Sequence, residues 1–217
     1  MWPRCPSFLN LSQHFPRDIR IIIYSHIRNF ERDVVRLSHG LKLKCPSKFC
    51  YRAATRGLWG ALKVMHERAQ ILDCKNVFSG AAVNGHLDII KWAFSKGYKA
   101  DKTMCYNASL SGHVEVLEWA KQNDLPWEFS ISFALHCGHL NILKWAHENG
   151  WEWTEGSSLT AAMNGHLHLL QWAHEKQLRI SDLLYAEIHT LKRNDGIIRW
   201  LCKNGYRHTK GCLCGTC

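Results

Sequence analysis

The 217-residue sequence has no apolar run long enough to span a membrane, and its densest short apolar stretch is IRIIIY at 19–24. Its first residues lack a basic segment followed by a long apolar one, so a secretory signal is not expected. These absences favour an intracellular protein. In that setting most of the ten cysteines are expected to be reduced thiols rather than parts of a disulfide framework.

Sequence signatures of catalysis are missing as well. The stretch GAAVNGHL at 80–87 has the glycines of a phosphate loop but not its lysine. The sequence has no nucleophile elbow and no His-Glu-x-x-His motif. We therefore expect no catalytic residue, no enzymatic activity and no cofactor.

Acidic residues are scarce in the first hundred positions, which hold 17 lysines and arginines against 6 aspartates and glutamates. Residues 101–217 are nearly balanced, with 11 basic and 12 acidic residues. A basic front half is compatible with binding to nucleic acid or to an acidic surface. Because no nucleic-acid motif accompanies the charge, a solvated basic surface is the preferred interpretation.

Repetition dominates the rest of the sequence. The phrase NGHLDIIKWA at 84–93 returns as SGHVEVLEWA at 111–120, CGHLNILKWA at 137–146 and NGHLHLLQWA at 164–173. Tryptophans recur at spacings of 27, 26, 27 and 28 residues: Trp92, Trp119, Trp145, Trp172 and Trp200. Glycines keep the same register, each four residues after an alanine: Gly85, Gly112, Gly138 and Gly165. Weaker copies at 53–65 and 185–201 make six units, which is the signature of stacked supersecondary elements.

Each unit is predicted to form two helices joined by a tight turn. In the clearest copy the second helix, at 87–94, has only Asp88 and Lys91 as polar residues, so neighbours must cover it on several sides. The turn glycine reaches positive φ at little cost and ends the first helix. The recurring tryptophans are expected to pack between layers. A connector of about ten residues is expected to lead to the next unit.

The pattern AAxxGHLxIxKWA resembles the helix-turn-helix half of the ankyrin repeat. The units are 26 to 28 residues long instead of about 33, and short tryptophan-bearing connectors replace the β-hairpin finger. In this the sequence is similar to a shortened ankyrin-like class common in large DNA viruses and some protists. The resemblance covers residues 49–206. It implies an all-α solenoid of six repeats, a monomer that binds a protein target in the cytoplasm or nucleus, in the viral case of a host cell.

Ankyrin-type arrays usually bind partners through their connectors and first helices. This family habit nominates five connector residues: Tyr98, Lys99, Glu128, Trp151 and Glu152. Of these, Trp151 is the expected exposed contact, whereas Trp127 and Trp153 recur at one connector position and are expected to be structural. Histidines recur just after the turn glycine and are predicted to be hydrogen-bond groups of the turn and helix start, not metal ligands: His86, His113, His139 and His166.

Residues 1–48 do not follow the repeat. An aliphatic helix predicted at 15–27, followed by DVVRLS and a cysteine-bearing stretch, resembles an F-box, although the closing tryptophan of that motif is missing. The resemblance implies a substrate adaptor that docks a Skp1-type subunit of a cullin ubiquitin ligase through one face: Phe15, Pro16, Ile19, Ile22, Ile23 and Ile27. The alternative is a helical pair that only caps the first repeat.

Residues 207–217 form a cysteine-rich tail. With the preceding unit, the tail supplies enough side chains for one zinc ion: Cys202, His208, Cys212, Cys214 and Cys217. The Cys-x-Cys-x-x-Cys spacing does not match a common zinc finger. The preferred interpretation is a chain end with free thiols, so no metal is assigned.

Overall fold

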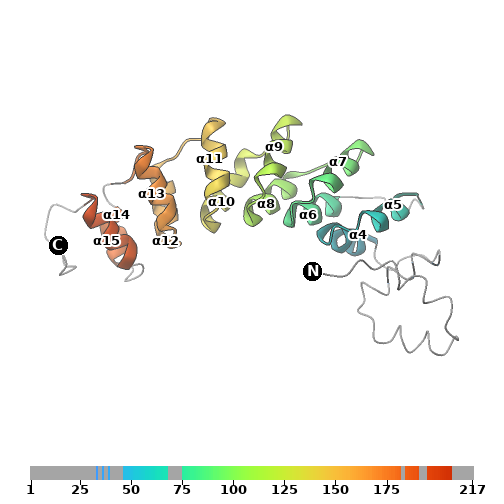
Figure 1. The fold of residues 1–217 in the computed structure, drawn as a ribbon, viewed down its shortest axis with the longest axis horizontal. Coiled ribbons are helices and arrows are strands. Elements are labelled where there is room, and N and C mark those ends of the chain that lie inside the picture. Colours follow the sequence, from blue (N-terminus) through green and yellow to red (C-terminus); the bar gives the residue numbers. More distant parts are fainter. Residues whose placement is uncertain are drawn as a thin grey trace, which may run out of the picture. The chain divides into compact units, whose positions relative to one another are not determined.

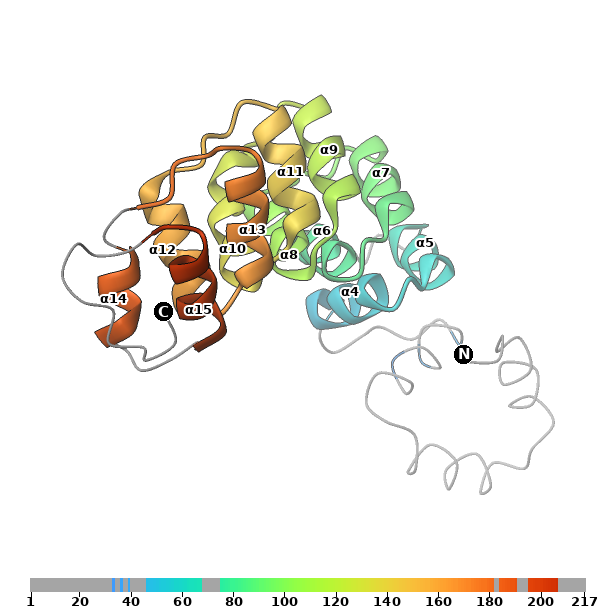
Figure 2. The ribbon, with the colours of Figure 1, turned by 60° about the vertical axis from the view of Figure 1, so that its left-hand side comes forward.

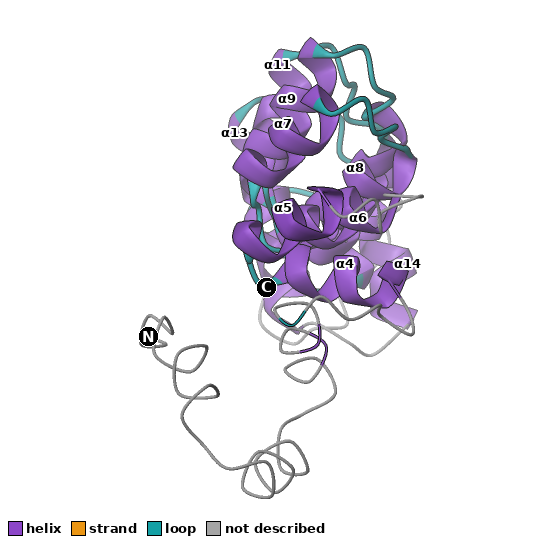
Figure 3. Ribbon diagram, turned by 90° about the vertical axis from the view of Figure 1, so that its right-hand side faces the viewer, coloured by secondary structure: helices purple, strands orange, loops and turns teal. Residues whose placement is uncertain are grey.

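A computed structural model describes residues 46–67, 75–181, 184–190 and 195–206, together with Asp33, Arg36 and His39. Within these ranges the chain consists of helices and turns without a strand, so the predicted all-α class is confirmed there (Figures 1 and 3). Across the same ranges, every helix is too short or too polar to cross a bilayer. Most of the N-terminal segment 1–48 and the whole tail 207–217 lie outside the described residues.

The chain divides into two compact units, Met1–Met104 and Cys105–Cys217. The first unit contains α4 (Pro46–Thr55), α5 (Trp59–Glu67), α6 (Lys75–Val83) and α7 (Leu87–Ser95). Helix α8 (Lys102–Ser111) begins at the end of the first unit and belongs mostly to the second. The second unit continues with α9 (Val114–Gln122), η1 (Glu128–Ser130), α10 (Ile131–Cys137), α11 (Leu140–Glu148), α12 (Glu155–Met163), α13 (Leu167–Glu175), α14 (Leu184–Thr190) and α15 (Asp195–Lys203).

Within the described residues the helices form six pairs, and in the first five pairs the two helices are joined by a glycine turn. In the pair α10–α11, Gly138 has a φ of +80° and follows the last residue of the first helix. The N–H of His139 then donates to the carbonyl of Ala134 at 2.9 Å, as in a Schellman motif. The turn glycines of the other pairs also have positive φ: Gly57, Gly85, Gly112 and Gly165.

In each of the two compact units, the core lies between the row of first helices and the row of second helices. The alanine four residues before each turn glycine is fully buried, which allows close helix contact: Ala53, Ala81, Ala108, Ala134 and Ala161. In the first unit α4 packs on α6. In the second unit α10 packs on α12, α12 packs on α14, and α9 lies beside α11 (Figure 2). Each unit thus buries its apolar residues by placing successive helix pairs against one another.

The recurring tryptophans of the second helices were expected to pack between layers, and two of the five are less buried than this expectation requires. Trp92, Trp119 and Trp172 are buried, whereas Trp145 and Trp200 are only half-buried. The ring of Trp145 meets the buried connector residue Trp127 edge to face, with centroids 4.7 Å apart. The connector tryptophans therefore close the core beside the second helices.

The connectors are shorter than the predicted ten or so residues, because the first helices begin earlier than expected. Before α8, the carboxylate of Asp101 accepts a hydrogen bond from the N–H of Thr103 at 3.0 Å. Before α12, Thr154 and Ser157 form a capping box. Such side chains start a helix by binding its free N–H groups. The connectors are thereby reduced to residues 96–101, 123–127 and 149–154.

Candidate functional site

Three aromatic side chains are exposed on the first helices of the second unit. Phe129 in η1 is 77% exposed, Tyr106 on α8 is 39% exposed and Phe133 on α10 is 36% exposed. The rings of Tyr106 and Phe133 meet edge to face with their centroids 4.4 Å apart. Phe129 and Phe133 are four residues apart in one continuous helical segment, so they lie on the same side of it. We call these three residues the aromatic patch.

Internal hydrogen bonds fix the segment that presents Phe129. The carbonyl of buried Trp127 accepts from the N–H of Ser130 at 2.9 Å and from its hydroxyl at 2.6 Å. The hydroxyl of Ser109 on α8 donates to the Ser130 oxygen at 2.7 Å. Because Trp127 and Ser130 are held on the core side, the intervening Phe129 is directed outward.

The aromatic patch adjoins one exposed carboxylate, Glu128 beside Phe129 in η1, and an uncharged helix. Helix α10, with the sequence ISFALHC, contains no lysine, arginine or carboxylate. Its exposed residue Cys137 is a free thiol. On the neighbouring helix α12, Met163 is 52% exposed. Exposed aromatic and thioether groups with few charges are the composition expected at the centre of a protein interface.

Two connector residues were predicted in the first unit, Tyr98 and Lys99, and Tyr98 packs inside the protein. Tyr98 is half-buried, and its hydroxyl forms a 2.5 Å hydrogen bond with Nδ1 of His66. Its ring meets the ring of Trp92 edge to face at 6.4 Å. Lys99 is exposed beside it. Tyr98 therefore ties one helix pair to the next instead of standing free for a partner.

The connector residues predicted in the second unit are Glu128, Trp151 and Glu152. Both glutamates are exposed. Trp151 is half-buried and meets Trp153 edge to face at 6.3 Å, which corrects the expectation that it is an exposed contact. The tryptophan packs on its own connector.

Sequence reasoning missed the aromatic patch. Phe133 stands one residue before the buried Ala134, at a position where four other repeats have Arg52, Gly80, Asn107 and Thr160. A position-by-position comparison of the outward residues of the first helices would have singled it out. The prediction instead followed connector residues, because their aromatic content was the more conspicuous signal.

The recurring histidines bond to the preceding helix pair, not to their own helix start. His86, His139 and His166 are N-cap residues without a side-chain capping bond, which corrects the expected helix-start role. Nε2 of His166 lies 2.7 Å from the carbonyl oxygen of His136, and Nε2 of His86 lies 3.2 Å from that of Thr55. These carbonyls belong to the last turn of a first helix, where no intrahelical donor is available.

Most of the residues weighed for zinc lie outside the described ranges. Cys202 is buried on α15 at 3% exposure, whereas the remaining ones are in the undescribed tail: His208, Cys212, Cys214 and Cys217. In the described part of the chain, no three His, Cys, Asp or Glu side chains gather as metal ligands would. The F-box-like face, from Phe15 to Ile27, is likewise outside the described residues.

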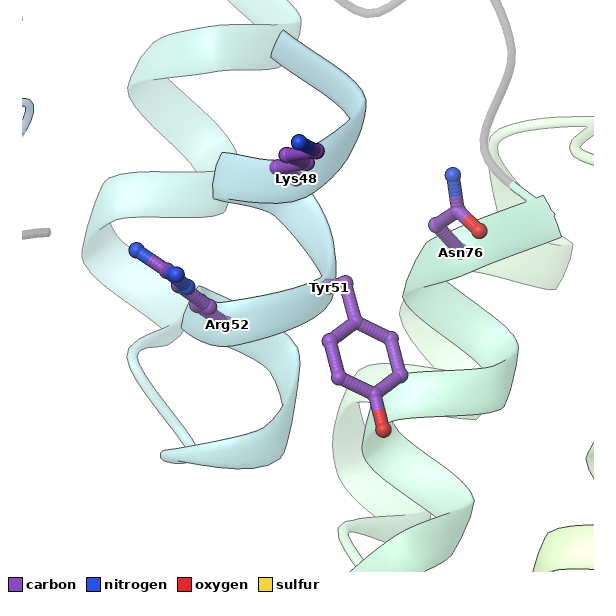
Figure 4. A pocket seen from close by; sticks show the side chains of 4 residues that line it. All are labelled: Lys48, Tyr51, Arg52 and Asn76. Atoms are coloured by element: carbon purple, nitrogen blue, oxygen red, sulfur yellow. The ribbon is translucent and has the colours of Figure 1, made fainter. Parts of the chain in front are cut away.

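The first unit contains a pocket of about 270 Å³ between α4 and α6. It is lined by Lys48, Tyr51, Arg52 and Asn76 (Figure 4). Lys48, Arg52 and Asn76 are exposed, and Tyr51 is 38% exposed. All four side chains end in hydrogen-bond donors, so this pocket differs in chemistry from the aromatic patch.

Comparison with known proteins adds no assignment, since no protein-family model matches the sequence and no curated protein matches it either.

Proposed function

We propose that this chain is a non-catalytic protein-interaction scaffold, built as an ankyrin-like array of short helix pairs. The single observation that carries the proposal is the aromatic patch of Tyr106, Phe129 and Phe133 on the first helices of the second unit. Six successive helix pairs support the array, and the first five of them have a turn glycine at positive φ. The first helices are also where the ankyrin resemblance implies that partners bind.

Burial of the patch under a partner would supply substantial binding free energy. Removing an exposed phenylalanine side chain from water contributes about 1.5–3 kcal/mol, and aromatic residues are frequent among the dominant contacts of interfaces. Phe129 is the most exposed of the large apolar side chains described, so it has the most surface left to bury. It is the expected anchor of the contact.

The patch is also rigid before binding. The bonds of Ser130 to Trp127 and Ser109 hold η1 in place, and the edge-to-face contact holds Phe133 against Tyr106. A preorganised surface loses less conformational entropy on association than a mobile one. Because α10 offers no charged side chain, the matching surface of the partner is expected to be apolar.

The test is capture of partners from the native cell with the full chain, followed by rebinding of each captured protein in purified form. The double variant Phe129→Ser, Phe133→Ser is expected to weaken binding of the true partner at least tenfold. Leu58→Ser is the matched control, since Leu58 is a 38% exposed apolar residue of the first unit. Equal binding by the double variant and the control would remove the patch from the proposal.

The F-box-like residues 15–27 extend the proposal to a substrate adaptor. A target held on the patch and a ubiquitin ligase held at the N-terminal segment would be kept close by the chain that joins them. The mechanism is a raised effective concentration and needs no catalytic group in the chain. Its support is the sequence resemblance, and its test is a direct binding measurement with a Skp1-type subunit.

A further inference from the structure

We infer that the pocket of the first unit binds a phosphate group carried by a partner protein, as a phosphorylated side chain. This binding activity goes beyond the aromatic patch: it involves other residues, in the other unit, and a ligand of opposite character. Each of the two surfaces can therefore fail its test without affecting the other.

The lining side chains match the hydrogen-bonding needs of a phosphate. Lys48 and Arg52 are basic side chains, and Tyr51 and Asn76 add a hydroxyl and an amide donor. A phosphorylated side chain carries about −1.5 to −2 charges at neutral pH and three strong acceptor oxygens. Within the described residues, none of these four side chains has a hydrogen bond or ion pair to another group. Their donors are available to a ligand.

The two helices that form the pocket are held firmly together. Lys48 and Arg52 are one turn apart on α4, the ring of Tyr51 lies between α4 and α6, and Asn76 stands in the first turn of α6 (Figure 4). The helices approach closely at Gly80, where an added Cβ would lie only 2.4 Å from the carbonyl oxygen of Tyr51. The backbone of the pocket is therefore fixed by helix packing, whereas the exposed side chains of Lys48 and Arg52 have to turn toward a bound phosphate (Figure 4).

The two helices that form the pocket contain no carboxylate side chain that would repel a bound anion. The sequences of α4, PSKFCYRAAT, and α6, KNVFSGAAV, contain neither aspartate nor glutamate. The N-terminal turn of α6, where Asn76 lies, adds the partial positive charge of a helix start. The local field therefore favours a group with more than one negative charge, and arginine can bind two of its oxygens at once.

The arrangement of the lining cations favours a single phosphate over a nucleic-acid backbone, since the neighbouring Lys75 and Arg56 are not part of the pocket lining. On α6 the residues at the positions equivalent to Lys48 and Arg52 are Asn76 and Gly80, and neither is charged. A protein that follows a nucleic-acid strand needs cations repeated along the path of the backbone. The lining cations are instead confined to one turn of α4, as in sites that recognise phosphorylated segments.

The test uses the full chain and the peptide acetyl-Gly-Ala-phosphoserine-Ala-Gly-amide, with binding followed by NMR through the side-chain amide of Asn76. Saturable shifts are expected with this peptide, and at least tenfold weaker binding is expected for its unphosphorylated form. The variant Lys48→Gln, Arg52→Gln should weaken binding at least tenfold. The control Lys91→Gln, Lys96→Gln removes two exposed lysines of the same unit and should change affinity less than twofold.

Several outcomes would overturn the inference. Equal binding of the phosphorylated and unphosphorylated peptides would exclude phosphate recognition, and equal loss in both double variants would exclude the pocket. Inorganic phosphate that binds as tightly as the peptide would exclude a protein-borne ligand as the preferred source. Tighter binding of a single-stranded thymidine oligomer, abolished by Lys48→Gln, Arg52→Gln, would assign the pocket to nucleic acid.

Discussion

His139 binds the main-chain carbonyl of Leu110 in the preceding helix pair, with Nε2 2.8 Å from the oxygen. Because a carbonyl can only accept, Nε2 must carry the proton and donate it. Leu110 lies in the last turn of α8, whose carbonyls have no donor within their own helix. Two residues after His139, the amide of Asn141 donates to the carbonyl of Gly112 at 2.8 Å. Side chains at the start of one second helix thus donate hydrogen bonds to the last carbonyl groups of the first helix in the preceding pair and to the turn that follows it.

The next helix pair repeats both contacts. Nε2 of His166 lies 2.7 Å from the carbonyl oxygen of His136, and Nε2 of His168 lies 2.8 Å from that of Gly138. The repetition explains why a histidine follows the turn glycine in four units while other outward residues vary. The imidazole is long enough to reach the preceding pair and supplies a donor where the backbone lacks one.

Replacing His139 by alanine is expected to lower the free energy of unfolding by about 1–2 kcal/mol, because a partly buried carbonyl loses its donor. Urea denaturation of the full chain measures the effect. His136→Ala is the matched control, since the side chain of His136 is exposed and the bond to His166 uses only its main chain. The control should stay within about 0.5 kcal/mol of wild type. Equal losses of unfolding free energy in His139→Ala and His136→Ala would show that the hydrogen bond of the His139 ring does not contribute to stability.

Gly138→Ala is expected to destabilise the chain more than Gly150→Ala. Both glycines have positive φ, +80° and +92°, so both variants incur the left-handed backbone cost of about 1–2 kcal/mol. A Cβ at Gly138 would also lie 2.7 Å from Nδ1 of His166, whereas nothing lies within 4 Å of one at Gly150. The displaced imidazole should lose its bond to the preceding pair, which adds about 1 kcal/mol.

A double variant separates the two contributions at Gly138. In a His166→Ala background the clashing ring is absent, so Gly138→Ala should cost no more than Gly150→Ala in the wild-type chain. The measurement is the coupling free energy from a double-mutant cycle of urea denaturations. A coupling near zero would mean that His166 adapts to the added methyl group without losing its bond.

Much of the helix pattern could be predicted because the residues that determine it recur at fixed positions in the repeats. The second helix of the clearest copy was predicted at 87–94, and α7 occupies Leu87–Ser95. The turn glycine and the alanine before it follow from backbone conformation and close packing, which are the same in every unit. The early starts of α8 and α12 were missed, because they depend on the capping side chains of Asp101 and Thr154. These two residues stand at one position of the repeat, but the residue type at that position varies, and the copy between them has Trp127 there.

The candidate surfaces were harder to predict for a physical reason. Periodicity identifies the residues that serve the fold, whereas a binding surface consists of residues that differ from one unit to the next. Phe129 differs from its equivalents in this way, and it was passed over in favour of Trp151. Trp151 proved to be half-buried because it pairs with Trp153 two residues later, a local contact that spacing alone does not reveal.

The adaptor extension predicts direct binding to a Skp1-type subunit at micromolar concentration. Ile22→Asp and Ile23→Asp, in the part of the chain outside the described residues, should weaken it more than a hundredfold, since each places a charge in an apolar contact. Phe129→Ser is the control and should leave this binding unchanged. Calorimetric titration of purified proteins measures both. If wild type shows no binding, the N-terminal segment is better explained as a cap.

The last prediction compares two buried tryptophans whose rings meet at 5.8 Å, Trp153 and Trp172. They are 7% and 4% exposed, so Trp→Phe removes a similar buried volume at each. Nε1 of Trp153 donates to the hydroxyl of Ser158 at 3.0 Å and to the carbonyl of Arg179 at 3.1 Å. Nε1 of Trp172 is buried without an acceptor among the described residues.

Because of this difference, Trp153→Phe should cost about 2 kcal/mol more than Trp172→Phe. The first substitution removes an N–H that is shared between two acceptors, whereas the second removes a buried donor that lacks a partner and whose burial costs free energy. Urea denaturation of both variants, followed by circular dichroism, gives the comparison independently of the fluorescence change at the substituted residue. A larger loss for Trp172→Phe would mean that its N–H has an acceptor in the remaining part of the chain.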